Sequence, residues 1–250
     1  MTIKYPKLMI EELEKEKNPN ITRYQKNKLI RRMFKKYPYL TEKYFLDICG
    51  VGEILEFLDS LKMRGEGIDL SENACFIAMK RVSNNIKVRN IDFMKINEKY
   101  ELIIMFDILE HVKDDDSFVK KSYNFLKENG YYLINVPAKK NLYGKKDKYF
   151  GHYRRYDKEE IIKLLKNNGF KILEFWSYGF KFTARVYEYL FNEEVKGDES
   201  ENTIQSSIKT PKSISSVNRW IKHFYWIINC FQKLLLNTDI GSEYMILCRK

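Results

Sequence analysis

The segment from Tyr44 to Leu70 constrains the fold more than any other part of the chain. It opens with an apolar run that ends in an acid, Asp47, and continues into a turn with two glycines, Gly50 and Gly52. Apolar residues at helical spacing follow, and a second strand-like run ends in another acid, Asp69. Glycines let the backbone approach a ligand, and an acid at the tip of the second strand can accept both hydroxyls of a ribose. The segment therefore predicts a β-α-β unit that binds an adenosine-containing ligand.

Strand-like and helix-like segments alternate through most of the remaining chain. The run YELIIMF is typical of a central parallel strand that is covered on both faces. Strands that alternate with helices predict an α/β fold with a doubly wound, mostly parallel sheet. We expect further strands at Ile86–Val88, Tyr100–Phe106, Tyr131–Val136, Phe170–Tyr178 and Glu243–Cys248, and helices at Ile21–Lys36, Ser71–Arg81, Asp114–Asn129 and Asp157–Asn168.

The 250 residues are enough for one α/β domain with additions. We expect residues 1–40 to form an N-terminal helical segment that serves as a lid, and residues 41–191 to form the core. Residues 192–216 are polar and poorly patterned, which predicts a mobile loop. Residues 217–250 are expected to supply a helical insertion and the last core strand of the same domain.

The net charge of +11 admits two interpretations. One is a lysine-coated, solvated surface; the other is an anionic partner such as a phosphorylated substrate, lipid headgroups or nucleic acid. The four cysteines include no C-x-x-C pair and are typical of reduced, packed residues, and the N-terminal residues lack a signal-peptide pattern. We therefore expect a cytoplasmic protein, with peripheral attachment to the inner face of the membrane as the alternative.

Two adenosine-containing ligands fit the opening segment, a dinucleotide and S-adenosylmethionine. A dinucleotide site has a third glycine where this chain has Leu55, and Glu53 would repel a pyrophosphate. S-adenosylmethionine has no phosphate and carries a sulfonium cation, so acids near the turn are tolerated. Asp92-Phe93 can serve the adenine, and Phe106-Asp107 ends a strand where the methionine end would lie.

These motifs together resemble the class I S-adenosylmethionine-dependent methyltransferases. LDICGVGEIL, GIDLS, IDF and FDILEHV are similar to four successive family motifs, although the glycine turn is one residue shorter than usual, which leaves the role of Asp47 open. A GHYRRY-like loop, a basic helix before the fold and an apolar insertion before the last strand resemble one subgroup. The resemblance implies a seven-stranded Rossmann-like sheet with an antiparallel last strand, and methyl transfer that converts S-adenosylmethionine into S-adenosylhomocysteine. The cofactor-binding residues that it implies are Asp47, Cys49, Gly50, Gly52, Asp69, Leu70, Asp92, Phe93, Phe106, Asp107 and Leu109.

The residues expected to act on the methyl acceptor lie after the fourth and fifth strands. His152, in a long polar loop, is a candidate catalytic base or substrate contact. His111 is the second candidate base, with a structural hydrogen bond as its alternative. Arg154 and Arg155 either clamp a carboxylate or phosphate or pair with acids such as Asp157 and Glu160. The expected substrate-binding residues are Tyr24, Tyr143, Tyr153, Arg154, Arg155 and Tyr156; no metal ligands are expected.

The acceptor is expected to be a small molecule, anionic in keeping with the charge, methylated on oxygen or nitrogen. A phosphorylated, nucleotide-linked or sugar-linked compound fits this description. The alternatives are an RNA methyltransferase, although no nucleic-acid module is recognisable and no nucleic acid is expected, and a non-catalytic module that only binds S-adenosylmethionine. The aromatic helix expected at residues 217–236 either caps the pocket, forms a homodimer or lies on a membrane surface.

Overall fold

The computed structural model describes residues 21–48, 52–179 and 236–250, with the side chains of residues 21–25 excepted. Cys49, Gly50, the side chain of Tyr24, the expected loop at 192–216 and nearly all of the expected helix at 217–236 lie outside these residues. The chain forms two compact units: residues 1–106, 120–133 and 249–250 in the first, and residues 107–119 and 134–248 in the second. The expected boundaries at residues 40, 191 and 216 stay predictions.

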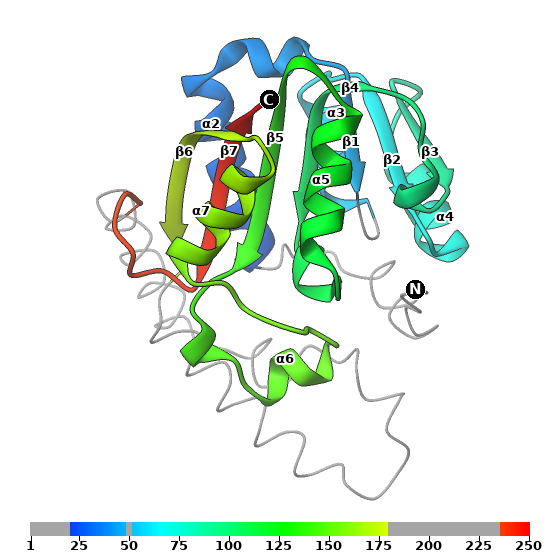
Figure 1. Cartoon of the computed structure of the whole chain (residues 1–250). Helices are drawn as coiled ribbons and strands as arrows, with labels where there is room; N and C mark the ends of the chain where they lie inside the picture. Colours follow the sequence, from blue (N-terminus) through cyan, green and yellow to red (C-terminus); the bar gives the residue numbers. More distant parts are fainter. Residues whose placement is uncertain (1–20, 49–51, 180–235) are drawn as a thin grey trace, which may run out of the picture. The chain divides into compact units, whose positions relative to one another are not determined.

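The sheet has seven strands in the order β3-β2-β1-β4-β5-β7-β6, which confirms the predicted α/β fold (Figure 1). β1 lies between β2 and β4 and pairs with both in parallel, and β2 pairs in parallel with β3. This order places the carboxyl end of the first strand beside that of the second, with Asp47 opposite Gly67. The elements of the first unit are α2 (Ile21–Lys36), η1 (Pro38–Glu42), β1 (Phe45–Ile48), α3 (Glu53–Ser60), β2 (Gly65–Asp69), α4 (Glu72–Arg81), β3 (Ile86–Asn90), η2 (Phe93–Lys95) and β4 (Tyr100–Phe106).

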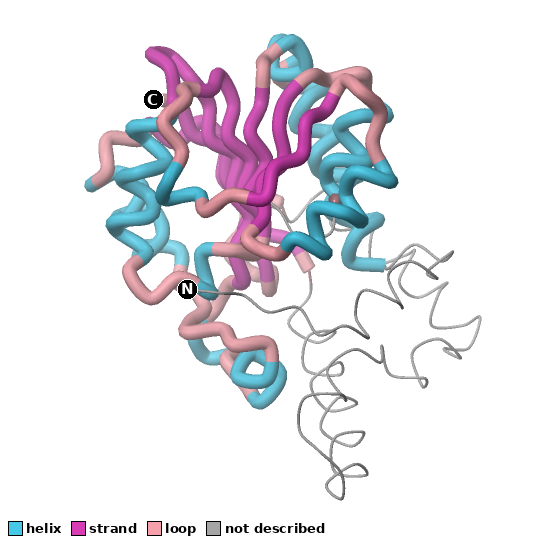
Figure 2. Tube along the Cα trace, turned by 90° about the vertical axis from the view of Figure 1, so that its right-hand side faces the viewer, coloured by secondary structure: helices cyan, strands magenta, loops and turns pink. Residues whose placement is uncertain are grey.

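Helices pack beside the strands of the first unit because their apolar residues recur at helical spacing. α4 contacts β2 and β3, while α3 contacts both α2 and α4. Figure 2 shows helices beside the strands. α2 has the predicted bounds and buries Ile30 and Met33 completely. α4 begins as predicted after Ser71, whose side chain accepts a hydrogen bond from the backbone N–H of Ala74 at 3.3 Å.

The second unit carries the long loop and the last strands. Figure 1 shows β7 running opposite to β5 and β6, so the antiparallel last strand is confirmed. β7 is buried from Tyr244 to Cys248, as expected of a strand covered on both faces. The elements of the second unit are η3 (Leu109–His111), η4 (Lys140–Leu142), α6 (Lys145–Tyr149), α7 (Lys158–Asn167), β6 (Lys171–Tyr178) and β7 (Glu243–Arg249). Two further elements, α5 (Asp115–Phe125) and β5 (Leu126–Pro137), are divided between the units.

Two predictions about local structure were wrong. α5 ends at Phe125 rather than near Asn129, and β5 begins at Leu126. Asn129 has φ 61° and lies inside this strand, because asparagine tolerates the left-handed region that the irregular strand requires there. The sequence also predicts that the Asp157 side chain caps α7. Asp157 does precede this helix, but its carboxylate accepts from the backbone N–H of Lys140 and not from α7. In the part of the chain that is described, no helix has the length and apolar character needed to cross a membrane.

Candidate active site

The first unit holds two neighbouring acids at the ends of β1 and β2. Asp47 is 1% exposed, and its Oδ2 has no hydrogen-bond partner among the residues of known placement. Burial, and then the charge of Asp69, raise the pKa of Asp47 to about 8. Burial also raises the pKa of Asp69 to about 7, against the lowering effect of backbone N–H donors from Ser71 and Leu70. This pair is costly to ionise without a positively charged partner.

The two acids fit S-adenosylmethionine, which brings both cations and hydroxyl donors. A buried carboxyl oxygen without a donor is a natural acceptor for an ammonium group. Asp69 is held in place by its Oδ1, which accepts from the backbone N–H of Ser71 at 2.7 Å. This hydrogen bond fixes the orientation of the carboxyl group, and a carboxyl group fixed at the tip of the second strand can accept hydrogen bonds from ribose hydroxyls. The residues present therefore suit the cofactor that the sequence indicates.

The turn before α3 depends on glycine. Gly52 has φ +82°, and a Cβ atom there would lie 2.7 Å from both Cα and Cβ of Ala78. In a dinucleotide site the third glycine, on the helix, lets the helix pack closely against the strand. In this chain the glycine that allows such close packing is on the strand. A Cβ at Gly67 would lie 2.2 Å from Cδ1 of the fully buried Leu55. Leu55 thus takes the place of that glycine because Gly67 leaves room for its side chain.

The other expected cofactor residues lie in varied surroundings. The Asp92 carboxylate accepts from the backbone N–H of Met94 at 2.8 Å and so begins η2. Phe93 is 4% exposed and packs edge-on against Phe125, with ring centroids 5.2 Å apart. Leu70 is exposed, whereas Phe106 and Leu109 are buried. The adenine-binding roles of Asp92 and Phe93 stay predictions.

In the second unit, Asn135 organises the region behind Asp107. Its Nδ2 donates to Oδ1 of Asp107 at 2.7 Å and to Oε2 of Glu243 at 3.2 Å. Its Oδ1 accepts from the hydroxyl of Tyr178 at 2.7 Å. Asp107 has φ 54°, a strained value for a residue other than glycine, and this amide holds its side chain. The sequence contains no local signal for Asn135, because its partners come from distant segments.

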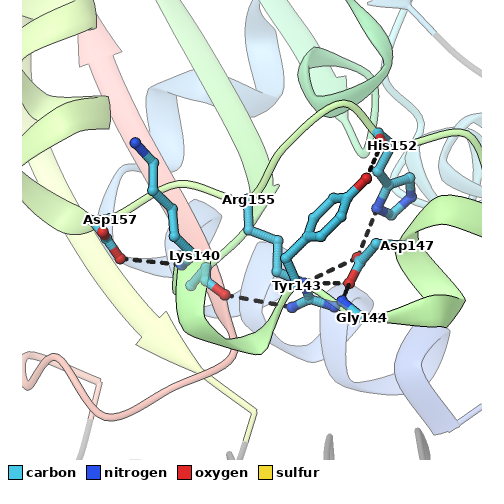
Figure 3. A network of polar contacts seen from close by, with 8 residues as sticks. Lys140, Tyr143, Gly144, Asp147, His152, Arg155 and Asp157 are labelled. Carbon is cyan, nitrogen blue, oxygen red and sulfur yellow. Dashed lines mark hydrogen bonds and ion pairs between the residues drawn. The ribbon is translucent and has the colours of Figure 1, made fainter.

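His152 is held by a buried carboxylate that the sequence analysis missed. Nδ1 of His152 lies 2.9 Å from Oδ1 of Asp147, and the Nε of Arg155 lies 2.9 Å from both oxygens of that carboxylate (Figure 3). The backbone N–H of Gly144 donates to Oδ2 at 2.9 Å, and the Tyr143 hydroxyl donates to the carbonyl of His152 at 2.8 Å. Burial by itself would raise the pKa of Asp147, but the hydrogen bonds from His152, Arg155 and Gly144 to its carboxylate lower the pKa to about 2. The only signal in the sequence was one acid within the lysine-rich run KKDKY.

The structure brings the two candidate bases together. The rings of His111 and His152 meet edge to face with centroids 4.6 Å apart. Burial, and then the charge of His152, lower the pKa of His111 to about 4, so it is neutral at neutral pH. Glu110 is 1% exposed, and its carbonyl accepts from the backbone N–H of Tyr153 at 2.8 Å. This hydrogen bond joins η3 to the loop that carries His152.

Both expected substrate arginines pair with acids. Arg155 is 8% exposed and bound to Asp147, while Nη1 of Arg154 lies 2.7 Å from Oδ2 of Asp115. Pairing with acids was one of the two alternatives, although the partners differ from Asp157 and Glu160. Tyr156 is fully buried and its hydroxyl lies 2.9 Å from Asp115, whereas Tyr153 is 47% exposed. The substrate-binding role of Tyr153 stays a prediction.

The strand order, the antiparallel β7 and the acids at the ends of β1 and β2 define the Rossmann-like fold of the class I methyltransferases. Residues 20–174 match the methyltransferase-domain family, and the chain belongs to it.

Two curated relatives are each named ubiquinone biosynthesis O-methyltransferase. The protein from Pelagibacter ubique (strain HTCC1062) is 32% identical over 125 residues, which cover 47% of this chain and 52% of that protein. The protein from Glaesserella parasuis serovar 5 (strain SH0165) is 32% identical over 106 residues, which cover 38% of this chain and 45% of the relative. The chain therefore spans about half the length of the curated relatives it matches.

Among solved structures, the magnesium protoporphyrin IX methyltransferase of Synechocystis PCC 6803 with bound S-adenosylhomocysteine is similar in fold. The TM-score is 0.55 at 18% identity, and the match covers 64% of this chain and 79% of that one. At this identity the likeness concerns the fold alone.

Proposed function

We propose that this protein transfers a methyl group from S-adenosylmethionine to an oxygen atom of a small molecule. The observation that carries the proposal is the buried Asp47 carboxyl beside Asp69, which suits a cationic, ribose-containing donor. Family membership supports methyl transfer, and the names of both curated relatives favour oxygen over nitrogen as the acceptor atom.

The first unit would bind the methyl donor. Asp47 would accept hydrogen bonds from the ammonium group of the methionine portion, and Asp69 would accept them from the ribose hydroxyls. The bound cofactor supplies an electrophilic methyl group on a sulfonium, so no proton is needed by the departing thioether. The two acids thus bind and orient, and they take no part in bond breaking.

The second unit would act on the acceptor. As the methyl group is transferred, a carbon–oxygen bond forms, the carbon–sulfur bond breaks and the hydroxyl loses its proton. His152 is the candidate to receive that proton, at Nε2, because Asp147 holds its Nδ1. His111 is neutral and lies against it, so it places no positive charge beside a protonated His152.

We further propose that the acceptor is anionic. Support comes from the lysines of the loop and α6, namely Lys145, Lys146 and Lys148, whose charge would attract an anion. The paired Arg154 and Arg155 would shape this loop instead of binding the acceptor with free guanidinium groups. Lys145→Ala and Lys148→Ala should then raise the KM for an anionic acceptor and leave that for a neutral analogue unchanged. Equal increases in KM for both acceptors would show that these lysines do not select an anionic acceptor.

The cofactor proposal is tested by calorimetry with S-adenosylmethionine, S-adenosylhomocysteine and NADH. We expect both sulfur compounds to bind one per chain, NADH to give no heat, and Asp47→Ala and Asp69→Ala to weaken binding at least tenfold. Failure of both sulfur compounds to bind would refute the enzyme interpretation.

The acceptor class is tested by transfer of a radiolabelled methyl group to two sets of acceptors. The first set contains hydroxylated aromatic acids and sugar nucleotides, and the second is bulk tRNA and rRNA. Label in the first set supports the proposal. Label in RNA, with binding that falls steeply as salt rises, would indicate the RNA methyltransferase alternative. Cofactor binding without transfer to either set would favour the non-catalytic binding module.

A further inference from the structure

We propose that Glu110, His111 and His152 bind one divalent transition-metal cation. Each offers one ligand atom, a carboxylate oxygen or an imidazole nitrogen, and these atoms all lie within 4.8 Å of one another. Two imidazoles and one carboxylate are the protein ligands of many catalytic zinc sites, which leave a further position open. All three residues belong to the second unit, so the proposal depends on no contact between the units.

The backbone holds the three groups in place without an ion. Glu110 and His111 are consecutive in η3, whereas His152 comes from the loop after α6. The backbone N–H of Tyr153 donates to the carbonyl of Glu110 at 2.8 Å and joins the two segments. The backbone N–H of His152 donates to the carbonyl of Asp147 at 2.9 Å, which fixes the loop on its other side. A site built on such a framework requires little ordering when an ion binds.

Both histidines already have the outer hydrogen bonds that are typical of metal ligands. Asp147 contacts Nδ1 of His152 at 2.9 Å, which leaves Nε2 with its lone pair available. His111 donates one ring N–H to the backbone carbonyl of Gly151, so its other nitrogen is likewise an acceptor. Carboxylates and backbone carbonyls are the usual partners of metal-bound imidazoles, since they set the tautomer and the ring orientation.

The charges of the cluster also favour a cation. Glu110 is 1% exposed, and a metal ion is bound by an ionised carboxylate and neutral imidazoles, the groups that this cluster offers. A divalent ion bound to one carboxylate and two neutral imidazoles has a net charge of +1. The deprotonated hydroxyl of an acceptor would balance this charge. Nitrogen ligands favour Zn²⁺ or Co²⁺ over Ca²⁺ and Mg²⁺, which prefer sets of oxygen ligands.

The role of the ion rests on the proposed function, whereas its binding does not. An acceptor hydroxyl in the open position would bind the ion through oxygen and lose its proton to water more easily. His152 would then be a ligand and not the proton acceptor. Methylation of that oxygen would weaken its bond to the ion and assist release of the product.

The test is metal binding by the full-length chain, purified without a polyhistidine tag and stripped with EDTA. We expect Zn²⁺ to bind one per chain in calorimetry, and Co²⁺ to give visible absorption bands of a low-coordinate nitrogen–oxygen site. His111→Ala and His152→Ala should each weaken binding about 100-fold or more, and Asp147→Asn should weaken it roughly 10- to 100-fold through the orientation of His152. His223→Ala, which changes the only other histidine, should bind as the unchanged chain does.

Two results would overturn the proposal: the absence of binding at one ion per chain, or binding that persists unchanged in both His111→Ala and His152→Ala. Circular dichroism and calorimetry with S-adenosylhomocysteine show that each variant is folded. These results are distinct from failure of the proposed function. Metal binding without methyl transfer would support the metal site and contradict the proposed function. Methyl transfer that EDTA does not affect, in a chain that binds no zinc, would support the proposed function and contradict the metal site.

Discussion

Asp147 and His152 are joined twice, by a contact of 2.9 Å between Oδ1 and Nδ1 and by a backbone hydrogen bond of 2.9 Å from the N–H of His152 to the carbonyl of Asp147. The first contact orients the imidazole, and the second closes the loop on which it stands. Because Arg155 binds the same carboxylate, one buried acid controls both a candidate catalytic residue and the stability of its loop.

Asp147→Asn should reduce both activity and stability. The amide cannot neutralise the buried Arg155, and breaking a buried ion pair from one side costs about 3–5 kcal/mol. We expect kcat to fall at least tenfold while the affinity for S-adenosylmethionine stays within twofold. Urea unfolding and steady-state kinetics measure the two effects. Asp116→Asn, at an exposed acid of the same unit, is the matched control and should change neither; an unchanged kcat in Asp147→Asn would show that His152 needs no orientation.

The stability of the ligand-free protein should fall as the pH rises. The pKa of Asp47 is about 8 in the folded state against 3.8 for an ordinary aspartate, so the folded state holds this proton more tightly. The resulting stabilisation is complete below about pH 4 and is lost as the pH rises to about 8, with a smaller part from Asp69 lost by about 7. Urea unfolding at pH 5.5, 7 and 8.5 should show this decline, and a smaller one in Asp47→Asn. Equal declines in the two proteins would mean that Asp47 ionises normally.

Gly52→Ala should destabilise the protein more than Gly151→Ala. Both glycines have positive φ, +82° and +76°, so both substitutions carry a similar backbone cost. A Cβ at position 52 would also meet Ala78 at 2.7 Å, whereas nothing lies within 4 Å of one at position 151. We expect a difference of about 1–3 kcal/mol in the free energy of unfolding. Similar losses for the two variants would show that the turn shifts to accept alanine.

Asn135→Asp should be destabilising, and increasingly so above neutral pH. In the native protein the carboxylates of Asp107 and Glu243 accept hydrogen bonds from the Asn135 amide. An ionised aspartate at position 135 has no proton to donate to either of them. We expect a loss of about 2–4 kcal/mol at pH 8 and a smaller loss at pH 5, where a proton can be shared. Asn135→Leu is the comparison: it removes the donors without adding a third carboxylate, so its loss should increase less with pH. A pH-independent loss in Asn135→Asp would contradict this account.

Features that depend on neighbouring residues were predicted well. α2 has the expected bounds because its apolar residues recur at helical spacing and Pro38 follows, and Ser71 begins α4 because its side chain reaches the next turn. The acids near the carboxyl ends of β1 and β2 were expected to lie close together, and the parallel pairing of these strands confirms this; their binding of one ligand stays a prediction.

Features that depend on distant partners were not predicted. Arg155 was expected either to bind substrate or to pair with an acid such as Asp157 or Glu160; it pairs with Asp147, which spacing alone did not indicate. Asn135 looked like an ordinary strand residue, yet it joins Asp107, Tyr178 and Glu243. No metal ligands were expected, and His152 becomes a neighbour of Glu110 and His111 only after folding.

The sequence by itself determined the class of fold and indicated the donor ligand, since strand periodicity, glycine turns and strand-end acids are local properties of the chain. Tertiary structure decided which acid orients which histidine and which polar groups are buried together. The physical reason is that the strength of these interactions depends on burial and on the approach of groups far apart in sequence. Asp47, an acid at the end of a strand, became a buried carboxyl with a raised pKa only when the sheet formed around it.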